Sequence, residues 1–110
     1  MHGPDVPTVT AAAVPDGAYL LDVREPGEWV AGHAPDATHV PLGELAARAD
    51  EVPADQDVVV VCRSGGRSAQ ATAYLNGIGR RAVNLDGGMQ AWAAAGRPMV
   101  SETGAAAVVA

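Results

Sequence analysis

Short runs of apolar residues recur along the chain and predict the strands of a sheet. The strongest run covers residues 58–61, four consecutive valines followed by a cysteine and a glycine-rich turn. Because both faces of such a strand are apolar, we expect it at the centre of a parallel sheet. Weaker runs with turn residues at their ends predict three further strands, at 18–23, 38–40 and 82–85.

Between these strands, apolar residues recur at helical spacing. A proline opens the segment 26–31, where a first helical turn tolerates it, and Gly32 follows the segment. The longest pattern starts directly after the glycine-rich turn and ends at Gly79. The predicted helices cover residues 26–31, 42–49, 67–78 and 89–95.

Strands and helices alternate along the chain, which is typical of an α/β domain. We predict a single domain over residues 5–100, with a mostly parallel central sheet and helices on both of its faces. A length of 110 residues leaves no room for a second domain. Residues 101–110 show no periodicity and no partner, and they predict a flexible C-terminal tail.

The composition narrows the class of protein. Hydrophobic residues make up 48% of the chain and charged residues 18%, which is enough for a packed core. The net charge of -6 argues against a nucleic-acid partner, because binding to phosphates needs a basic face. No apolar run approaches the roughly 20 residues that cross a bilayer. The first residues lack the basic and apolar stretches of a secretory signal, so we expect a cytoplasmic protein without membrane association.

Cys62 is the only cysteine, which excludes an intramolecular disulfide and any multi-cysteine metal site. It follows the valine run, at the strand end where open α/β sheets bind ligands. A glycine-rich loop with Arg63 and Arg67 then leads into the longest predicted helix. Backbone N–H groups at a helix N-terminus and arginine side chains stabilise a thiolate or an oxyanion. We therefore predict a lowered pKa for Cys62 and a nucleophilic role.

Four segments of the chain resemble the rhodanese family, in that family's order. Residues 62–68, with the sequence CRSGGRS, resemble its active-site loop. Residues 20–25 (LLDVRE) resemble the end of one of its strands, and residues 32–37 (GHAPDA) resemble the turn that follows. Residues 85–92 (LDGGMQAW) resemble a later glycine-containing segment. The four matches extend over nearly the whole chain.

The resemblance implies a single-domain thiosulfate sulfurtransferase in which Cys62 carries a sulfane sulfur as a persulfide. It also implies that the loop binds the substrate through Arg63, Ser64, Gly65, Gly66, Arg67 and Ser68. The sulfur donor is then a small anion such as thiosulfate, and the acceptor is cyanide or a thiol, including a protein thiol. Such a ping-pong scheme needs one nucleophile and neither a metal nor an organic cofactor.

Several residues near the strand ends have predicted supporting roles. Asp22 and Arg24 are expected to support the loop, mainly as a structural ion pair, and Glu28 is a candidate partner of Arg24. His33 is expected to fix a turn through backbone hydrogen bonds. Trp29 is expected to anchor the core.

Two other functions stay open at this level. Cysteine-dependent phosphatases and arsenate reductases also hold an oxyanion in a strand–loop–helix nest, but five residues separate their cysteine and arginine. Four separate Cys62 from Arg67, which favours sulfur transfer. The other alternative is a non-enzymatic rhodanese-like module that relays sulfur to a protein partner or regulates one.

Overall fold

The computed structural model describes residues 6–110, whose strands form one five-stranded sheet. Every adjacent pair of strands is parallel, in the order β1-β5-β4-β2-β3. In chain order the strands are β1 (Thr8–Val9), β2 (Tyr19–Asp22), β3 (Thr38–His39), β4 (Asp57–Val61) and β5 (Arg81–Leu85). The valine run therefore forms the central strand, as its two apolar faces predict.

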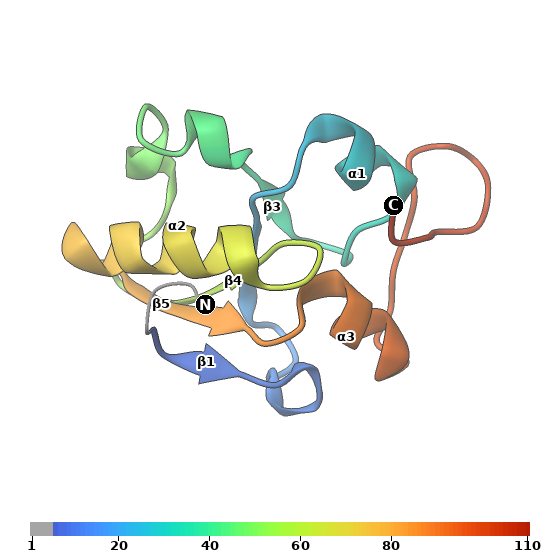
Figure 1. The fold of residues 1–110 in the computed structure, drawn as a ribbon, viewed down its shortest axis with the longest axis horizontal. Coiled ribbons are helices and arrows are strands. Elements are labelled where there is room, and N and C mark those ends of the chain that lie inside the picture. The colour runs from blue at the N-terminus through green and yellow to red at the C-terminus, as the bar shows by residue number, and fades with distance from the viewer. Residues whose placement is uncertain (1–5) are drawn as a thin grey trace.

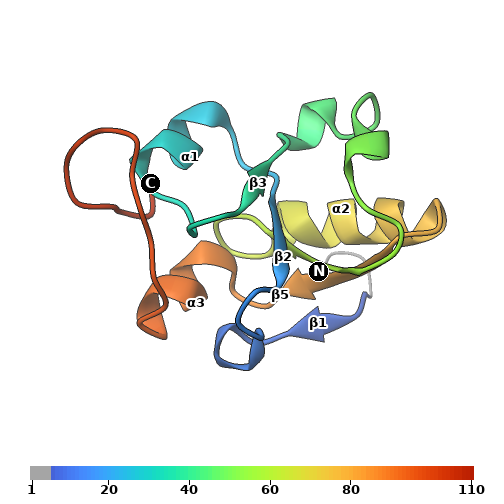
Figure 2. The same ribbon diagram turned by 180° about the vertical axis from the view of Figure 1, so that it is seen from behind.

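Helices pack on both faces of the sheet, which confirms the predicted α/β architecture (Figures 1 and 2). The helices are α1 (Pro26–Ala31), α2 (Gly66–Gly77) and α3 (Gly88–Ala94). On one face, Ala71 and Leu75 of α2 pack against alternate valines of β4. On the other face, Met89 and Trp92 of α3 pack against the remaining valines. No helix of residues 6–110 is long and apolar enough to cross a membrane.

The segment predicted as a helix at 42–49 is not an α-helix. It begins with a short 3₁₀ turn, Leu42–Glu44, and a second one, Ala49–Glu51, starts at its last residue. An isolated segment of this length gains too little from helical hydrogen bonds to outweigh tertiary contacts. Here the Arg80 side chain donates to the carbonyl oxygens of Ala49 and Val52 at 2.9 Å each, and so stabilises the irregular path.

The edge strand β1 was not predicted from the sequence. It is two residues long and has no alternation that could reveal it. Its pairing with β5 is instead a contact between residues far apart in the chain, Thr8 with Asn84 and Val9 with Leu85. The predicted first residue of the domain, Asp5, lies outside the described residues.

The C-terminal segment, residues 101–110, has partners that the sequence did not indicate. It runs beside α1 in both views (Figures 1 and 2). The backbone N–H of Glu102 donates to the Val30 carbonyl at 2.9 Å, and that of Val108 donates to the Ala31 carbonyl at 3.0 Å. These contacts differ from the expectation of a segment without a partner.

Candidate active site

Cys62 directly follows the carboxyl end of β4, and three residues then lead the chain into α2. Gly65 ends this loop with a φ of 113°, a left-handed conformation that glycine adopts without a steric penalty. The turn directs the backbone N–H of Gly65 toward the Cys62 sulfur, 3.1 Å away. The loop therefore curls around the sulfur atom. Its Ser64 and Gly66 are exposed to solvent.

Hydrogen-bond donors converge on the Cys62 sulfur, which is almost completely buried. Burial alone would raise the pKa of the thiol, because a buried thiolate loses its hydration. The Ser68 hydroxyl, 3.2 Å from Sγ, and the backbone N–H groups of Ser68, Gly65 and Ser64 outweigh burial and hold the pKa below its ordinary value. The lowered pKa agrees with the prediction from the sequence. These hydrogen bonds, more than the charges of the loop arginines, produce it.

Asn84 forms a second layer behind this arrangement. Ser68 Oγ lies 2.5 Å from Asn84 Oδ1, and Asn84 Nδ2 donates to the Gly65 carbonyl at 3.1 Å. This residue was not among those predicted from the sequence. Its signal is a polar residue inside an apolar strand, two positions after Ala82 and therefore on the face of β5 that α2 covers.

Arg67 is held by a carboxylate from another helix. Its two terminal nitrogens donate to the two carboxylate oxygens of Glu28 at 2.7 and 2.8 Å. These hydrogen bonds lower the pKa of Glu28 to about 2. The predicted pairing of Glu28 with Arg24 is wrong, because α1 directs Glu28 toward the start of α2 while Arg24 is buried beside its own strand.

Asp22 and Arg24 form a fully buried ion pair at the end of β2. Arg24 Nε and Nη2 contact the Asp22 carboxylate at 2.8–3.1 Å, and Nη2 also donates to the Gly32 carbonyl at 2.7 Å. Among residues 6–110, Arg24 Nη1 has no hydrogen-bond partner. The pair fixes the end of the strand next to the one that precedes Cys62.

His33 occupies the turn as expected, with Nδ1 2.9 Å from the Ala34 carbonyl oxygen. Its Nε2 lies 2.8 Å from a carboxylate oxygen of Glu102, which joins the turn to the C-terminal segment. Trp29 differs from the prediction because it is only half-buried. It stacks against both His33 and His39, with ring centroids 3.6 and 4.7 Å away.

Arg63 is exposed beside the loop and also contacts the C-terminal segment. Its Nε donates to the Ala110 carbonyl oxygen at 3.0 Å. Both loop arginines therefore have protein partners, and an anionic ligand would have to compete for them. Within residues 6–110, no group of three His, Cys, Asp or Glu side chains is arranged to hold a metal ion.

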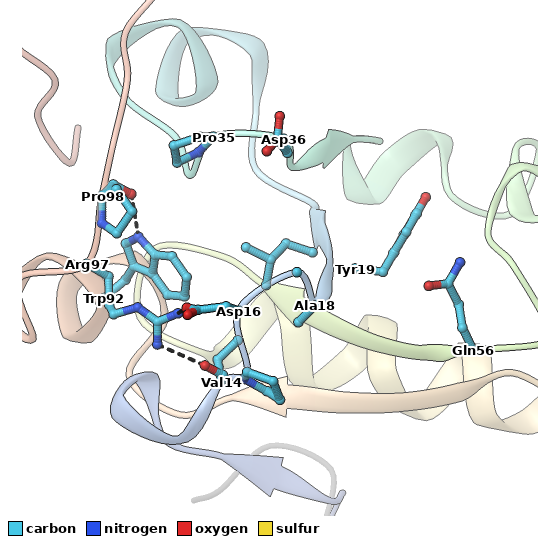
Figure 3. A pocket seen from close by; sticks show the side chains of 13 residues that line it. Val14, Asp16, Ala18, Tyr19, Pro35, Asp36, Gln56, Trp92, Arg97 and Pro98 are labelled. Atoms are coloured by element: carbon cyan, nitrogen blue, oxygen red, sulfur yellow. Dashed lines mark hydrogen bonds and ion pairs between the residues drawn. The ribbon is translucent and has the colours of Figure 1, made fainter.

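A separate pocket of about 380 Å³ lies at the opposite end of the sheet (Figure 3). It is lined by Tyr19 and Gln56, at the amino ends of β2 and β4, and by Trp92 and Arg97. Arg97 lies 4.5 Å from the Trp92 ring centroid and donates to the Val14 carbonyl. Parallel strands place Cys62 at their other end, so this pocket is no part of the cysteine site.

The fold and the loop together define a class of protein. Its members are α/β domains in which a cysteine at the carboxyl end of a parallel sheet lies in a nest of N–H groups. Comparison with known families makes the assignment specific. The rhodanese-like domain matches residues 7–95, and the chain belongs to that family of sulfurtransferases.

Individual relatives agree with this assignment. A sulfurtransferase of Allochromatium vinosum is 48% identical over 91 residues, which cover 81% of this chain and 84% of the relative. The thiosulfate sulfurtransferase GlpE of Pseudomonas syringae is 40% identical over 77 residues, 69% of this chain and 73% of the relative. The crystal structure of a rhodanese-related protein from Thermoplasma volcanium superimposes with a TM-score of 0.81 at 32% identity, covering 86% of this chain and 97% of that one.

Proposed function

We propose that this protein transfers a sulfane sulfur from a small anionic donor such as thiosulfate to a thiol or to cyanide, through a persulfide on Cys62. The observation that carries the proposal is the convergence of the Gly65 N–H and the Ser68 hydroxyl on Cys62 Sγ, which stabilises a thiolate. The thiosulfate sulfurtransferase among the relatives supports thiosulfate as donor. A lone cysteine that must stay reduced between turnovers suits the cytoplasm.

The proposed chemistry has two displacement steps. In the first, the Cys62 thiolate attacks the outer sulfur of thiosulfate and forms a new S–S bond. The original S–S bond breaks, and sulfite leaves with its electron pair. In the second, an acceptor thiolate or cyanide attacks the outer sulfur of the persulfide, and the Cys62 thiolate leaves. The two steps together regenerate the enzyme without a redox cofactor.

The burial of Cys62 favours a donor with few atoms over a bulky one. Charge–charge attraction would then come from Arg63, whose guanidinium lies at the exposed rim of the loop. Arg67 contributes less, because Glu28 already neutralises much of its charge. In this proposal, the loop N–H groups hold the sulfur while Arg63 attracts the sulfonate end of the donor.

The persulfide step is tested by intact mass. Purified wild type and Cys62→Ser are incubated with excess thiosulfate. The donor is then removed, and the intact mass of each protein is measured. We expect a gain of about one sulfur atom in wild type, its removal by cyanide, and no gain in the variant, because only the Cys62 thiolate can attack. A wild type that gains nothing from thiosulfate while its cysteine is reduced would contradict the proposal.

Donor recognition is tested by steady-state kinetics of Arg63→Ala. Removing one charge-assisted hydrogen bond should raise KM for thiosulfate about tenfold, with a smaller effect on kcat. Arg81→Ala is the matched control, because Arg81 starts β5 at the far end of the sheet and pairs with Asp57 at 3.0 Å. It removes the same charge without approaching the site. Equal effects of the two substitutions would show that only the net charge of the protein matters.

A further inference from the structure

The Ser68 hydroxyl faces two acceptors but has one proton to donate. Its oxygen lies within hydrogen-bonding distance of both Cys62 Sγ and Asn84 Oδ1. When Cys62 is a thiol, the two contacts do not conflict, because the S–H donates to Ser68 Oγ while the hydroxyl donates to Asn84 Oδ1. When Cys62 is a thiolate, a single proton remains for the two acceptors.

The orientation of Asn84 is fixed by a group outside this pair. Its Nδ2 donates to the Gly65 carbonyl at 3.1 Å, and a reversed amide would place two oxygens against each other there. The acceptor end of Asn84 must therefore point at Ser68. Ser68 is itself fixed on α2, where Thr72 Oγ1 donates to its carbonyl at 2.7 Å. The side chains of Ser68 and Asn84 are both buried, so water does not replace either partner readily.

We propose that Asn84 is a positioning residue that competes with the Cys62 sulfur for the single hydroxyl proton of Ser68. The competition destabilises the thiolate relative to the thiol and to the persulfide. The inner sulfur of the persulfide is a weaker hydrogen-bond acceptor than a thiolate, so it loses less when Ser68 donates to Asn84. The inference rests on the proposed role of Cys62 as the nucleophile. Its consequence is a thiolate that is less completely satisfied by hydrogen bonds and therefore a stronger nucleophile.

The charged groups around Cys62 would not explain a change in its ionisation when Asn84 is replaced. Arg67 approaches from α2 and is paired with Glu28 of α1. Arg63, next to Cys62 in the loop, is exposed and donates to the Ala110 carbonyl oxygen. On the other side, the adjacent strand β2 ends in the fully buried ion pair of Asp22 and Arg24. Asn84, on β5, is neutral at every pH. A change in Cys62 ionisation on replacing Asn84 would therefore come from hydrogen bonding and not from a lost charge.

The test is a titration of Cys62 in Asn84→Leu, followed by the ultraviolet absorbance of the thiolate. The chain has one cysteine, and subtracting the same titration of Cys62→Ser removes the absorbance of its two tyrosines as they ionise. Leucine has nearly the shape of asparagine but leaves Ser68 free to donate to Sγ. We expect about threefold to tenfold more thiolate than in wild type at a fixed pH below the midpoint. The same substitution in a Ser68→Ala background should have no such effect.

The matched control is Asn76→Leu. Asn76 also joins α2 to β5, through two hydrogen bonds to the backbone of Ala82 at 2.8 and 3.0 Å, but has no contact with Ser68. It should change stability and leave the titration unchanged. If Asn84 only holds the loop through Gly65, its loss would loosen the Gly65 N–H and reduce the thiolate fraction. A reduction, no change, or an equal increase without the Ser68 hydroxyl would each overturn the proposal.

A second measurement uses unaltered protein and so does not depend on whether the variants fold. The side-chain amide of Asn84 is followed by NMR across the Cys62 titration. The carbonyl of this amide loses a hydrogen-bond donor as the thiolate forms, so the chemical shift of the amide should change with the same midpoint as the Cys62 titration. A constant chemical shift would refute the competition. Neither titration involves sulfur transfer. A failed persulfide test would therefore count against the proposed function alone, and a failed titration against the role of Asn84 alone.

Discussion

The contact between α3 and the cysteine loop gives the sharpest structural prediction. Gly88, the first residue of α3, has a φ of 58° and packs its backbone against the loop. A Cβ at this position would overlap with the carbonyl oxygen of Cys62 and lie 2.7 Å from the carbonyl carbon and oxygen of Arg63. All of these neighbours are backbone atoms, so no side-chain rotation relieves the overlap. Gly88→Ala must therefore displace α3 or the loop.

The expected cost follows from what this displacement breaks. The backbone N–H groups of Met89 and Gln90 donate to the carbonyls of Cys62 and Arg63 at 2.8 and 3.1 Å. Losing the two hydrogen bonds costs about 1 kcal/mol each. The left-handed backbone adds about 1–2 kcal/mol for a residue with a Cβ. We expect Gly88→Ala to lower the free energy of unfolding by about 3–4 kcal/mol, a large part of the ~5–15 kcal/mol typical of a domain.

Gly96→Ala separates the two contributions. Gly96 also has a left-handed backbone, with a φ of 71°, but no atom lies within 4 Å of the position that an added Cβ would take. It should cost only the backbone contribution, about 1–2 kcal/mol. The assay is urea unfolding of both variants, followed by circular dichroism with the slope of the transition compared. If the free energies of unfolding of Gly88→Ala and Gly96→Ala agree within about 0.5 kcal/mol, the close approach of α3 to the loop is refuted.

Two further predictions concern contacts of α1. Because the pKa of Glu28 is about 2 in the folded protein against an ordinary 4.5, its pair with Arg67 stabilises fully above pH 4.5 and is lost as the pH falls toward 2. In urea unfolding at neutral pH, the free energy of unfolding of wild type should exceed that of Glu28→Gln by about 1 kcal/mol, and near pH 2 the difference should vanish. A difference that does not depend on pH would contradict this. Gly32→Ala should release the C-terminal segment to proteolysis, because its Cβ would lie 2.8 Å from the Val108 nitrogen and overlap with its carbonyl oxygen. Gly27→Ala, which meets no atom within 4 Å, should leave the cleavage rate unchanged.

The sequence could predict those strands and helices whose own residues show a clear apolar pattern. Four valines in a row form β4, and the apolar spacing after Arg67 forms α2, with ends within one residue of the prediction. The segment after Pro41 shows the opposite case. Its apolar spacing suits a helix, yet its end is held by Arg80, which comes about thirty positions later and donates to the carbonyls of Ala49 and Val52.

The same division holds within the site. The position of Cys62 follows from a strand that ends at a glycine-rich loop, and that information is local. The partners of the loop are not local: Glu28 is 39 positions from Arg67, and Asn84 is 16 positions from Ser68. No periodicity connects such residues, since the sheet order β5-β4-β2 alone brings their elements together. A buried polar residue in an apolar strand was the one local sign of Asn84.

The acidity of the chain raises the question of how it would stabilise an anion at all. Its net charge is -6, and one of the two loop arginines is neutralised by Glu28. The groups that stabilise a thiolate at Cys62 are instead hydrogen-bond donors without net charge, namely the Ser68 hydroxyl and the backbone N–H groups. Fixed dipoles at contact distance act locally and are screened little by salt. The distant acidic side chains are screened within about 10 Å at moderate ionic strength. A nest of neutral donors can therefore lower the pKa of a thiol even in an acidic protein.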